Sequence, residues 1–274
     1  MFLQTFSRQP VTSFFFLAFF ISWGLWSPFY FNKDIPEYWA LPGAWGPTLS
    51  ALLVTAFTEG RKGVKKLLGR LLIWRTPWYY YLFAILFCTA LIILSMGINS
   101  FFFGGALDFS SVTKGMGLEK EEMGRALLFL PLFYLINTVV GGPIAEELGW
   151  RGFAQEKLKE RMGFLSAGLL IGFVWFLWHL PLILFLPKAT GDLPIWTYGS
   201  IMTLMGGLFG WLYYKSKGSV LLVILFHGGM NFENGILGPV LKNEPTVQAI
   251  YIGLLLFIIL VLYRTNKRKS TNRR

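Results

Sequence analysis

Long runs of apolar residues, separated by short polar connections, dominate this chain. Eight runs have about 17–25 mostly apolar residues, the length that a helix needs to cross a bilayer. They cover residues 11–31, 41–58, 78–103, 126–150, 164–186, 196–214, 218–238 and 247–263. Trp and Tyr gather near the ends of these runs, as in the interfacial belt of a membrane protein. The pattern predicts an all-α, polytopic membrane protein with about eight transmembrane helices.

The composition supports this class of protein. Of the 274 residues, 54% are hydrophobic and 14% are charged, whereas a soluble domain has about 25% charged residues. We expect one transmembrane domain over 1–274, because the eight runs leave no room for a second globular domain. The single cysteine, Cys88, excludes an intrachain disulfide and a cysteine-based metal site. The first run is too long for a signal peptide and lacks a small-residue cleavage site.

The distribution of basic residues predicts the orientation. Nineteen of the 25 Lys and Arg residues fall in alternate connections and in the two terminal segments. These segments are 1–10, 59–77, 151–162, 215–217 and the tail 264–274. The positive-inside rule then places both termini in the cytoplasm and requires an even number of spans. Short outer loops and the lack of organellar sorting signals indicate a bacterial plasma membrane.

The partners implied by the charge are lipids. The connection 59–77 is basic and amphipathic, so we expect it to lie on the inner membrane surface and attract anionic lipid. The net charge of +11 mostly reflects the excess of Lys and Arg that a membrane protein carries in its cytoplasmic loops. No nucleic-acid-binding motif or aromatic platform is present, so we expect no nucleic-acid partner.

Two adjacent carboxylates, Glu146 and Glu147, stand near the end of the run 126–150. Ionisable residues inside or at the edge of a membrane helix are costly and usually functional. Neighbouring residues point about 100° apart on a helix, so the two carboxylates cannot share one role. Glu147 and Arg151, four residues apart, can form an ion pair, which leaves Glu146 for chemistry. The alternative is an ordinary helix end whose charges reach the headgroups.

Both histidines of the chain lie inside apolar runs. His179 follows Trp175 by four residues, so the two rings share a face. Pro181 would bend the helix near His179, leaving backbone groups to be satisfied locally. His227 precedes Asn231 by four residues, so these two side chains also point the same way.

Each of these polar residues alone can be explained as a hydrogen bond between helices. Together they supply a general base, a second proton carrier and an amide donor, which the hydrolysis of an amide requires. Other protease chemistries lack their signatures. The chain has no H-E-x-x-H zinc motif, no G-x-S-x-G elbow and no Asp in the middle of a span for an aspartyl dyad.

Three spaced motifs occur in this order on separate runs: Glu146-Glu147-x-x-x-Arg151, Trp175-x-x-x-His179 and His227-x-x-x-Asn231. They resemble the EExxxR, FxxxH and HxxxN motifs of the type II CAAX prenyl endopeptidase family. This family, also called CPBP or Abi, contains CAAX proteases and bacteriocin-processing enzymes. One departure is Trp175, which stands where the family commonly has Phe. The motif-bearing core would cover 126–238.

The resemblance implies an eight-helix membrane endopeptidase with an internal cavity open to the cytoplasmic side. It implies that Glu146 and His179 activate a water, and that His227 and Asn231 stabilise the oxyanion of the tetrahedral intermediate. These groups can meet only if the helix of Glu146 continues past Trp150, or if the cavity is hollowed from the cytoplasm.

Supporting roles would fall to Glu147, Arg151 and Trp175. We favour a site without a metal, because a His paired with an Asn fits an oxyanion donor pair. If a metal is present, Glu146 and the two histidines are the expected Zn²⁺ ligands, with a water in the fourth position.

The substrate class follows only from the resemblance: a peptide or a lipidated protein in the membrane. The competing interpretation is a non-catalytic membrane scaffold, or a bacteriocin self-immunity protein, on the same fold. The intact set of polar residues favours the peptidase. A transporter is disfavoured, since the chain shows no inverted repeat and no paired Gly- or Pro-broken spans.

Overall fold

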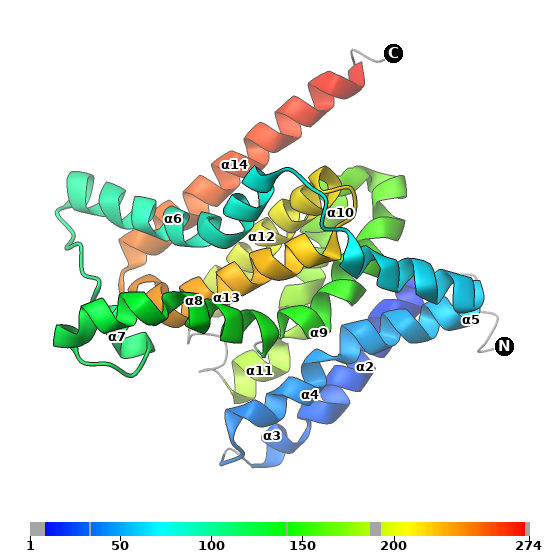
Figure 1. Cartoon of the computed structure of the whole chain (residues 1–274), viewed down its shortest axis with the longest axis horizontal. Coiled ribbons are helices and arrows are strands. Elements are labelled where there is room, and N and C mark those ends of the chain that lie inside the picture. The colour runs from blue at the N-terminus through cyan, green and yellow to red at the C-terminus, as the bar shows by residue number, and fades with distance from the viewer. Residues whose placement is uncertain (1–8, 33, 141, 187–192, 272–274) are drawn as a thin grey trace.

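The computed structural model describes residues 9–32, 34–140, 142–186 and 193–271, with side chains to residue 266. These residues form helices joined by short connections and contain no strand (Figure 1). The elements are α2 (Pro10–Trp26), α3 (Pro28–Phe31), η1 (Glu37–Ala40), α4 (Leu41–Ala44), α5 (Gly46–Gly69), η2 (Arg70–Leu72), α6 (Trp78–Phe103), α7 (Ser110–Gly115), η3 (Lys120–Glu122), α8 (Met123–Val139), α9 (Pro143–Glu147), the π-helix η4 (Leu148–Gln155), α10 (Glu156–Trp178), α11 (Leu180–Phe185), α12 (Ile195–Lys215), α13 (Val220–Asn243) and α14 (Pro245–Thr271).

The all-α, polytopic architecture expected from the sequence is confirmed. Eight helices of the described chain have 17 residues or more: α2, α5, α6, α8, α10, α12, α13 and α14. By length and composition, five segments are apolar and long enough to cross a membrane: Glu37–Leu72, Trp78–Phe103, Lys120–Phe185, Val220–Asn243 and Pro245–Asn266. The helix Pro10–Trp26 is apolar and slightly shorter.

The predicted helix over 126–150 is wrong in one respect. The structure has a break in this run, because α8 ends at Val139 and α9 begins at Pro143. Proline disfavours a helical conformation in the residue before it, and Gly142 adopts a positive φ of 106°. The helix α6, by contrast, begins and ends at the predicted residues 78 and 103.

The helix α13 lies in the interior, where it contacts α6, α7, α8, α9, α12 and α14. Two glycines, Gly228 and Gly229, let neighbouring helices come close to it. A Cβ at position 228 would collide with the side chain of Thr138 in α8, and one at 229 would lie 2.7 Å from the backbone oxygen of Ala84 in α6. The close packing holds α13 and its polar residues in a fixed position.

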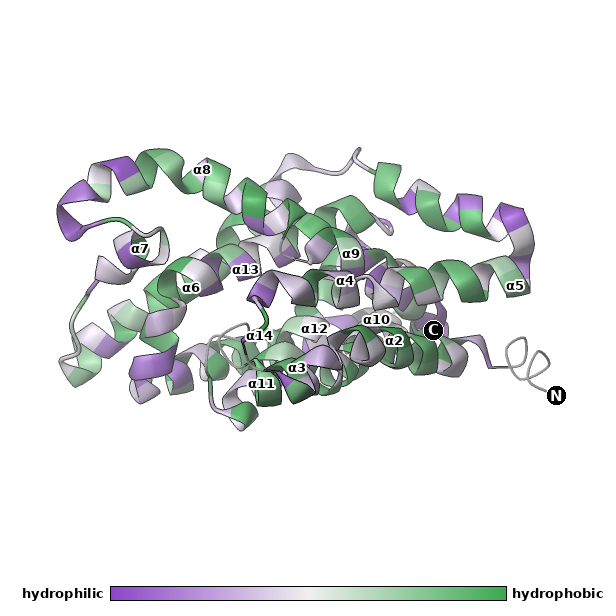
Figure 2. Cartoon of the chain, turned by 90° about the horizontal axis from the view of Figure 1, so that it is seen from below, coloured by the Kyte–Doolittle hydropathy of each residue, from purple (hydrophilic) through white to green (hydrophobic). Residues whose placement is uncertain are grey.

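Hydrophilic residues gather at two ends of the molecule. One group surrounds α7 and the start of α8, and the other lies at the far end of α5, with largely hydrophobic helices between them (Figure 2). The basic segment that we expected on the membrane surface forms the second half of α5 and η2, beyond a kink at Gly60. It is tied to the helical body, because Arg70 pairs with Glu156 at 2.8 Å.

Candidate active site

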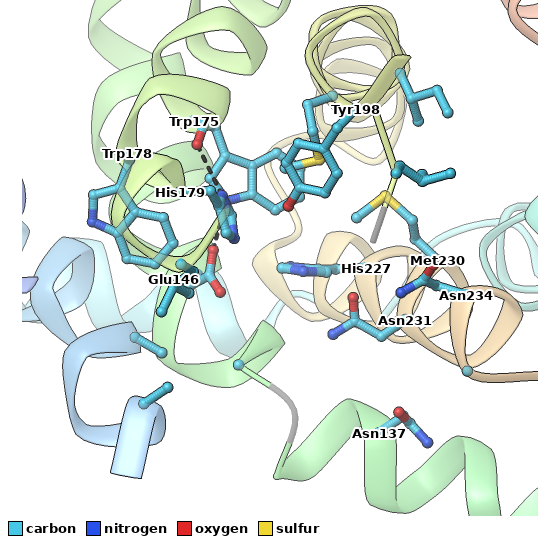
Figure 3. Close-up of a pocket in the computed structure, with 18 of the residues that line it drawn as sticks. Asn137, Glu146, Trp175, Trp178, His179, Tyr198, His227, Met230, Asn231 and Asn234 are labelled. Atoms are coloured by element: carbon cyan, nitrogen blue, oxygen red, sulfur yellow. Dashed lines mark hydrogen bonds between the residues drawn. The ribbon is translucent and has the colours of Figure 1, made fainter. Parts of the chain in front are cut away.

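A cavity of about 440 Å³ lies among α9, α10, α12 and α13. Four candidate residues line it together: Glu146, His179, His227 and Asn231 (Figure 3). Glu146 is 4% exposed and His227 is 3% exposed. The fold therefore brings one carboxylate, two imidazoles and one amide from three parts of the chain to the wall of a single cavity.

The break before α9 directs Glu146 into this cavity. Gly142 accepts a left-handed backbone at little cost, and Pro143 then starts α9 with a φ suited to the first helical position. A Cβ at position 142 would lie 2.7 Å from Oε1 of Glu146. A side chain at this position would therefore take the space that the carboxylate occupies.

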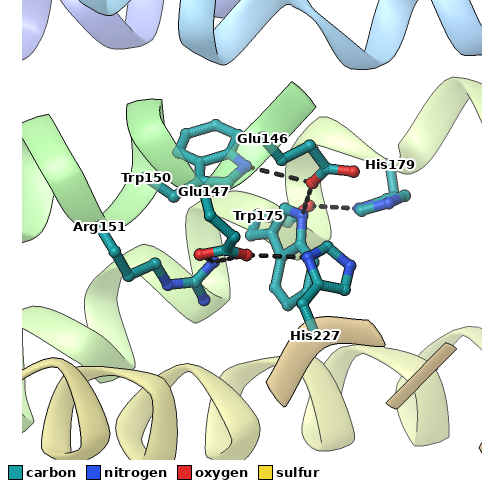
Figure 4. A network of polar contacts seen from close by, with 7 residues as sticks. All are labelled: Glu146, Glu147, Trp150, Arg151, Trp175, His179 and His227. Carbon is teal, nitrogen blue, oxygen red and sulfur yellow. Dashed lines mark hydrogen bonds and ion pairs between the residues drawn. The ribbon is translucent and has the colours of Figure 1, made fainter. Parts of the chain in front are cut away.

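Two buried indoles hold the carboxylate of Glu146. Its Oε2 accepts a hydrogen bond of 2.7 Å from Nε1 of Trp175 and one of 3.3 Å from Nε1 of Trp150 (Figure 4). Both indole N–H groups therefore donate to Oε2, and no hydrogen bond from another described residue to Oε1 is seen. Oε1, beside the cavity-lining Gly142, is then the oxygen placed to contact a water or a substrate.

His179 stands at the junction of α10 and α11. Its Nδ1 lies 2.9 Å from the backbone oxygen of Trp175. A carbonyl oxygen only accepts hydrogen bonds, so Nδ1 must be the donor. In the neutral ring, Nε2 is then the basic nitrogen, and Figure 3 shows the ring directed into the cavity beside Glu146.

The ion pair expected between Glu147 and Arg151 is present, and it extends to a third residue. Oε1 of Glu147 lies 2.8 Å from Nη1 of Arg151 and also 2.8 Å from Nδ1 of His227 (Figure 4). Glu147 and Arg151 have no exposed side-chain surface. The guanidinium also lies 4.0 Å from the ring centre of Phe209, a cation–π contact.

This contact determines what His227 can do. Because the carboxylate of Glu147 accepts the hydrogen bond, Nδ1 of His227 carries a proton. Nε2 can then donate to an oxyanion only when the ring is an imidazolium, whose charge Glu147 would balance. The sequence did not reveal this link, since the two residues are 80 positions apart.

The chain path meets the first of the two conditions for these groups to come together. The helix of Glu146 continues past Trp150, from α9 through η4 into α10, and Glu146 lies in the first turn of α9. A π-helix is rare and is frequently found at functional sites. Here η4 carries Trp150 and Arg151, which contact the two carboxylates one helical turn earlier.

Three residues of the site were missed at the sequence level. Trp150 donates to Glu146, and its spacing of four residues could have indicated this contact. Tyr198 lines the cavity with its ring 5.8 Å from that of His179. Glu233 also lines it, and an acidic residue in an otherwise apolar run was the available signal.

The alternative site, with Zn²⁺ bound by Glu146, His179 and His227, can be compared with the positions of these side chains. In the described part of the chain, no group of three His, Cys, Asp or Glu side chains is placed to hold a metal ion. Both imidazoles do have their Nδ1 atoms bound to an oxygen acceptor. That pattern occurs around metal-ligating histidines, but equally orients a histidine for proton transfer.

The open part of the cavity is formed by η1, where Glu37 and Tyr38 are exposed. Leu193, just before α12, and Leu241, near the end of α13, complete this side of the lining. These residues belong to connections that carry few of the basic residues. Among these lining residues Glu37 and Tyr38 are exposed, whereas Leu241 is buried.

Comparison with known proteins gives the family context. A family model described as Rce1-like, the type II CAAX prenyl endopeptidases, matches residues 128–232. The range contains all three motifs, from Glu146 to Asn231. The chain is also 25% identical, over 231 residues, to CAAX prenyl protease 2 of Methanococcus maripaludis, covering 81% of this chain and 80% of that protein.

The resemblance to the type II CAAX prenyl endopeptidases is confirmed. The relationship, together with the apolar helices, supports an intramembrane protease in a multi-pass membrane protein. It agrees with a site built from the residues of the three motifs inside the helical body. The Phe-to-Trp departure at position 175 places an N–H donor against Glu146 that a Phe ring would not provide.

Proposed function

We propose that this chain is an intramembrane endopeptidase of the CAAX protease type that hydrolyses a peptide bond with a water activated by Glu146. The observation that carries the proposal is the shared cavity of Glu146, His179, His227 and Asn231. Burying ionisable and polar side chains within a membrane helix bundle costs free energy, and residues of this kind are usually functional.

The residues take distinct roles in the proposed reaction. Oε1 of Glu146, or Nε2 of His179, accepts a proton from the water as its oxygen attacks the scissile carbonyl carbon. Nε2 of the His227 imidazolium and the side-chain amide of Asn231 donate hydrogen bonds to the oxyanion that forms. Collapse of this intermediate breaks the C–N bond, and the accepted proton passes to the leaving amine.

Glu147, Arg151 and Trp175 would position these groups without touching the substrate. Glu147 fixes the tautomer of His227 through its hydrogen bond, while Arg151 pairs with Glu147 and holds its carboxylate in place. Trp175 fixes the carboxylate of Glu146 and forms a wall beside both imidazoles.

We infer a glutamate-type enzyme in which no metal takes part. His227 and Asn231 both line the cavity, which supports an oxyanion donor pair, and a protonated Nε2 of His227 that donates to the oxyanion cannot also ligate a metal. Zinc bound by Glu146, His179 and His227 remains the alternative that a chelation experiment tests.

We propose that residues 1–274 form one domain in a bacterial plasma membrane, with both termini cytoplasmic. In that orientation the mouth at Glu37 and Tyr38 faces away from the cytoplasm. The charge bias supports the termini, so we propose access from the extracytoplasmic side in place of the expected cytoplasmic one.

The substrate we propose is a membrane-associated peptide or lipidated protein. The name of the methanogen relative speaks for a prenylated substrate of that protein, and the mainly apolar cavity lining is compatible with lipid-linked peptides. The test compares peptides released by cells with wild type and with Glu146→Gln. A catalyst yields fragments that vanish with the variant, whereas a scaffold or immunity protein yields equal sets.

A further inference from the structure

Glu233 is a buried carboxylate that the proposed reaction does not use. Its side chain is 3% exposed and belongs to α13, two residues beyond Asn231. It lines the same cavity as the candidate catalytic residues. Its Oε1 is fully buried and has no hydrogen-bond partner among the described residues.

The cavity around Glu233 is acidic. Three carboxylates line it, those of Glu37, Glu146 and Glu233, while no Lys or Arg is found among its described lining residues. The nearby carboxylate of Glu147 is already paired with Arg151 and His227. A carboxylate in a buried, apolar place costs free energy unless a cation or donor pairs with it. A cationic group of a ligand would supply the partner that the described residues do not provide for Oε1 of Glu233.

The position along α13 sets the reach of such a ligand. Glu233 follows His227 by six residues, which is about 9 Å along the helix at 1.5 Å per residue. An extended peptide covers that distance with about three residues. Leu241, further along α13, also lines the cavity, so Glu233 lies between the reacting groups and that end of the cavity.

We propose that Glu233 forms a cation-binding subsite of the cavity, which takes an amino or guanidinium group of the substrate peptide within about three residues of the scissile bond. The subsite gives the enzyme a preference for peptides with Lys or Arg, or a free N-terminus, at this distance. The inference rests on the proposed function, because it assigns the cationic group to a peptide bound in the proposed active site.

The experiment measures binding and cleavage separately. Purified protein in phosphatidylcholine vesicles is titrated with N-acetylated apolar dodecapeptides that carry one Lys, or one norleucine, at each position in turn. Binding is measured with Glu146→Gln, which removes the proposed base, and cleavage with the native chain. We expect Lys to improve binding over norleucine by about 10- to 100-fold at one or two positions, the range for a hydrogen bond to a charged group.

Adding Glu233→Gln should reduce the ratio of the Lys-peptide affinity to the norleucine-peptide affinity to about one. Glu233→Asp should give a ratio between one and that of the chain with Glu233. The control is Glu244→Gln, which removes one negative charge from the exposed end of α13 and should keep the ratio. Unacetylated norleucine peptides that bind like the Lys peptides would identify the N-terminal ammonium as the ligand.

An unchanged ratio with Glu233→Gln, or an equal loss of both peptides, would overturn the subsite. Thermal unfolding of each variant separates these results from misfolding, and Glu233→Asp supplies the folded comparison if the Gln variant fails. Selective binding of Lys peptides without any cleavage by the native chain would count against the peptidase and leave the subsite in place.

Discussion

The indole Nε1 of Trp175 donates a hydrogen bond of 2.7 Å to Oε2 of Glu146, across 29 positions of sequence. The same indole lies 4.9 Å from the ring of His227 and 5.6 Å from that of His179, measured between ring centres. One buried side chain thus contacts three of the four proposed catalytic groups. Phe at this position would keep the packing and lose the donor.

We therefore expect Trp175→Phe to lower kcat by about 10-fold or more, with a smaller change in KM, because a hydrogen bond to a charged group contributes about 1.5–3 kcal/mol. The matched control is Trp150→Phe, which removes the longer bond of 3.3 Å to the same oxygen and should cost less. Steady-state kinetics on a cleaved peptide gives both values. Equal losses in the two variants, or losses that follow the unfolding temperature, would speak for a merely structural ring.

The adjacent carboxylates offer a paired test of role. Both are buried, but Glu147 pairs with Arg151 whereas Glu146 accepts bonds from neutral indoles. Glu147→Gln leaves a buried guanidinium uncompensated, so it should destabilise the protein by about 3–5 kcal/mol and lower activity as well. Glu146→Gln should abolish activity with little loss of stability.

Thermal unfolding and peptide cleavage, measured on both variants, check this difference. Arg151→Ala should resemble Glu147→Gln in both measurements, and His179→Ala should resemble Glu146→Gln. If Glu147→Gln proved as stable as the native chain, the ion pair would not hold His227 in the way that the geometry indicates.

The apolar pattern was sufficient for the helices but not for the break that forms the site. The run 78–103 is interrupted by no proline and forms one helix. In 126–150 the mean hydropathy hides the Gly142–Pro143 pair, at which backbone sterics override the apolar pattern. This pair directs Glu146 into the cavity. The hydrophobic pattern therefore failed at the segment that places the proposed catalytic carboxylate.

Spacing within a helix predicted the local pairs of the site and could not reveal its long-range contacts. The Glu147–Arg151 pair follows from a separation of four residues. The bond of Glu147 to His227, and that of Trp175 to Glu146, depend on how separate helices pack. Glycines such as Gly228 permit that packing, but a glycine does not indicate which helix it will meet.

The metal question leads to a prediction about chelation. In the proposed reaction Nε2 of His227 carries a proton and donates to the oxyanion, so we expect this nitrogen not to bind zinc. Dialysis against a strong chelator should leave peptide cleavage within about twofold of its starting value, less than 1 kcal/mol in barrier height. Elemental analysis of the active protein should find zinc well below one equivalent. Stoichiometric zinc, lost with activity and restored with it, would contradict this mechanism.

The orientation of the cavity can be tested with single cysteines in a Cys88→Ala background. Tyr38, at the mouth, is 65% exposed, and Asn266, in the basic tail, is also exposed. With cytoplasmic termini, a membrane-impermeant maleimide should label Tyr38→Cys in intact spheroplasts and Asn266→Cys only after permeabilisation. The two sites lie at opposite ends of the helical body, so they must show opposite accessibility. Labelling of the tail from outside, together with a protected Tyr38→Cys, would invert the orientation and open the cavity to the cytoplasm.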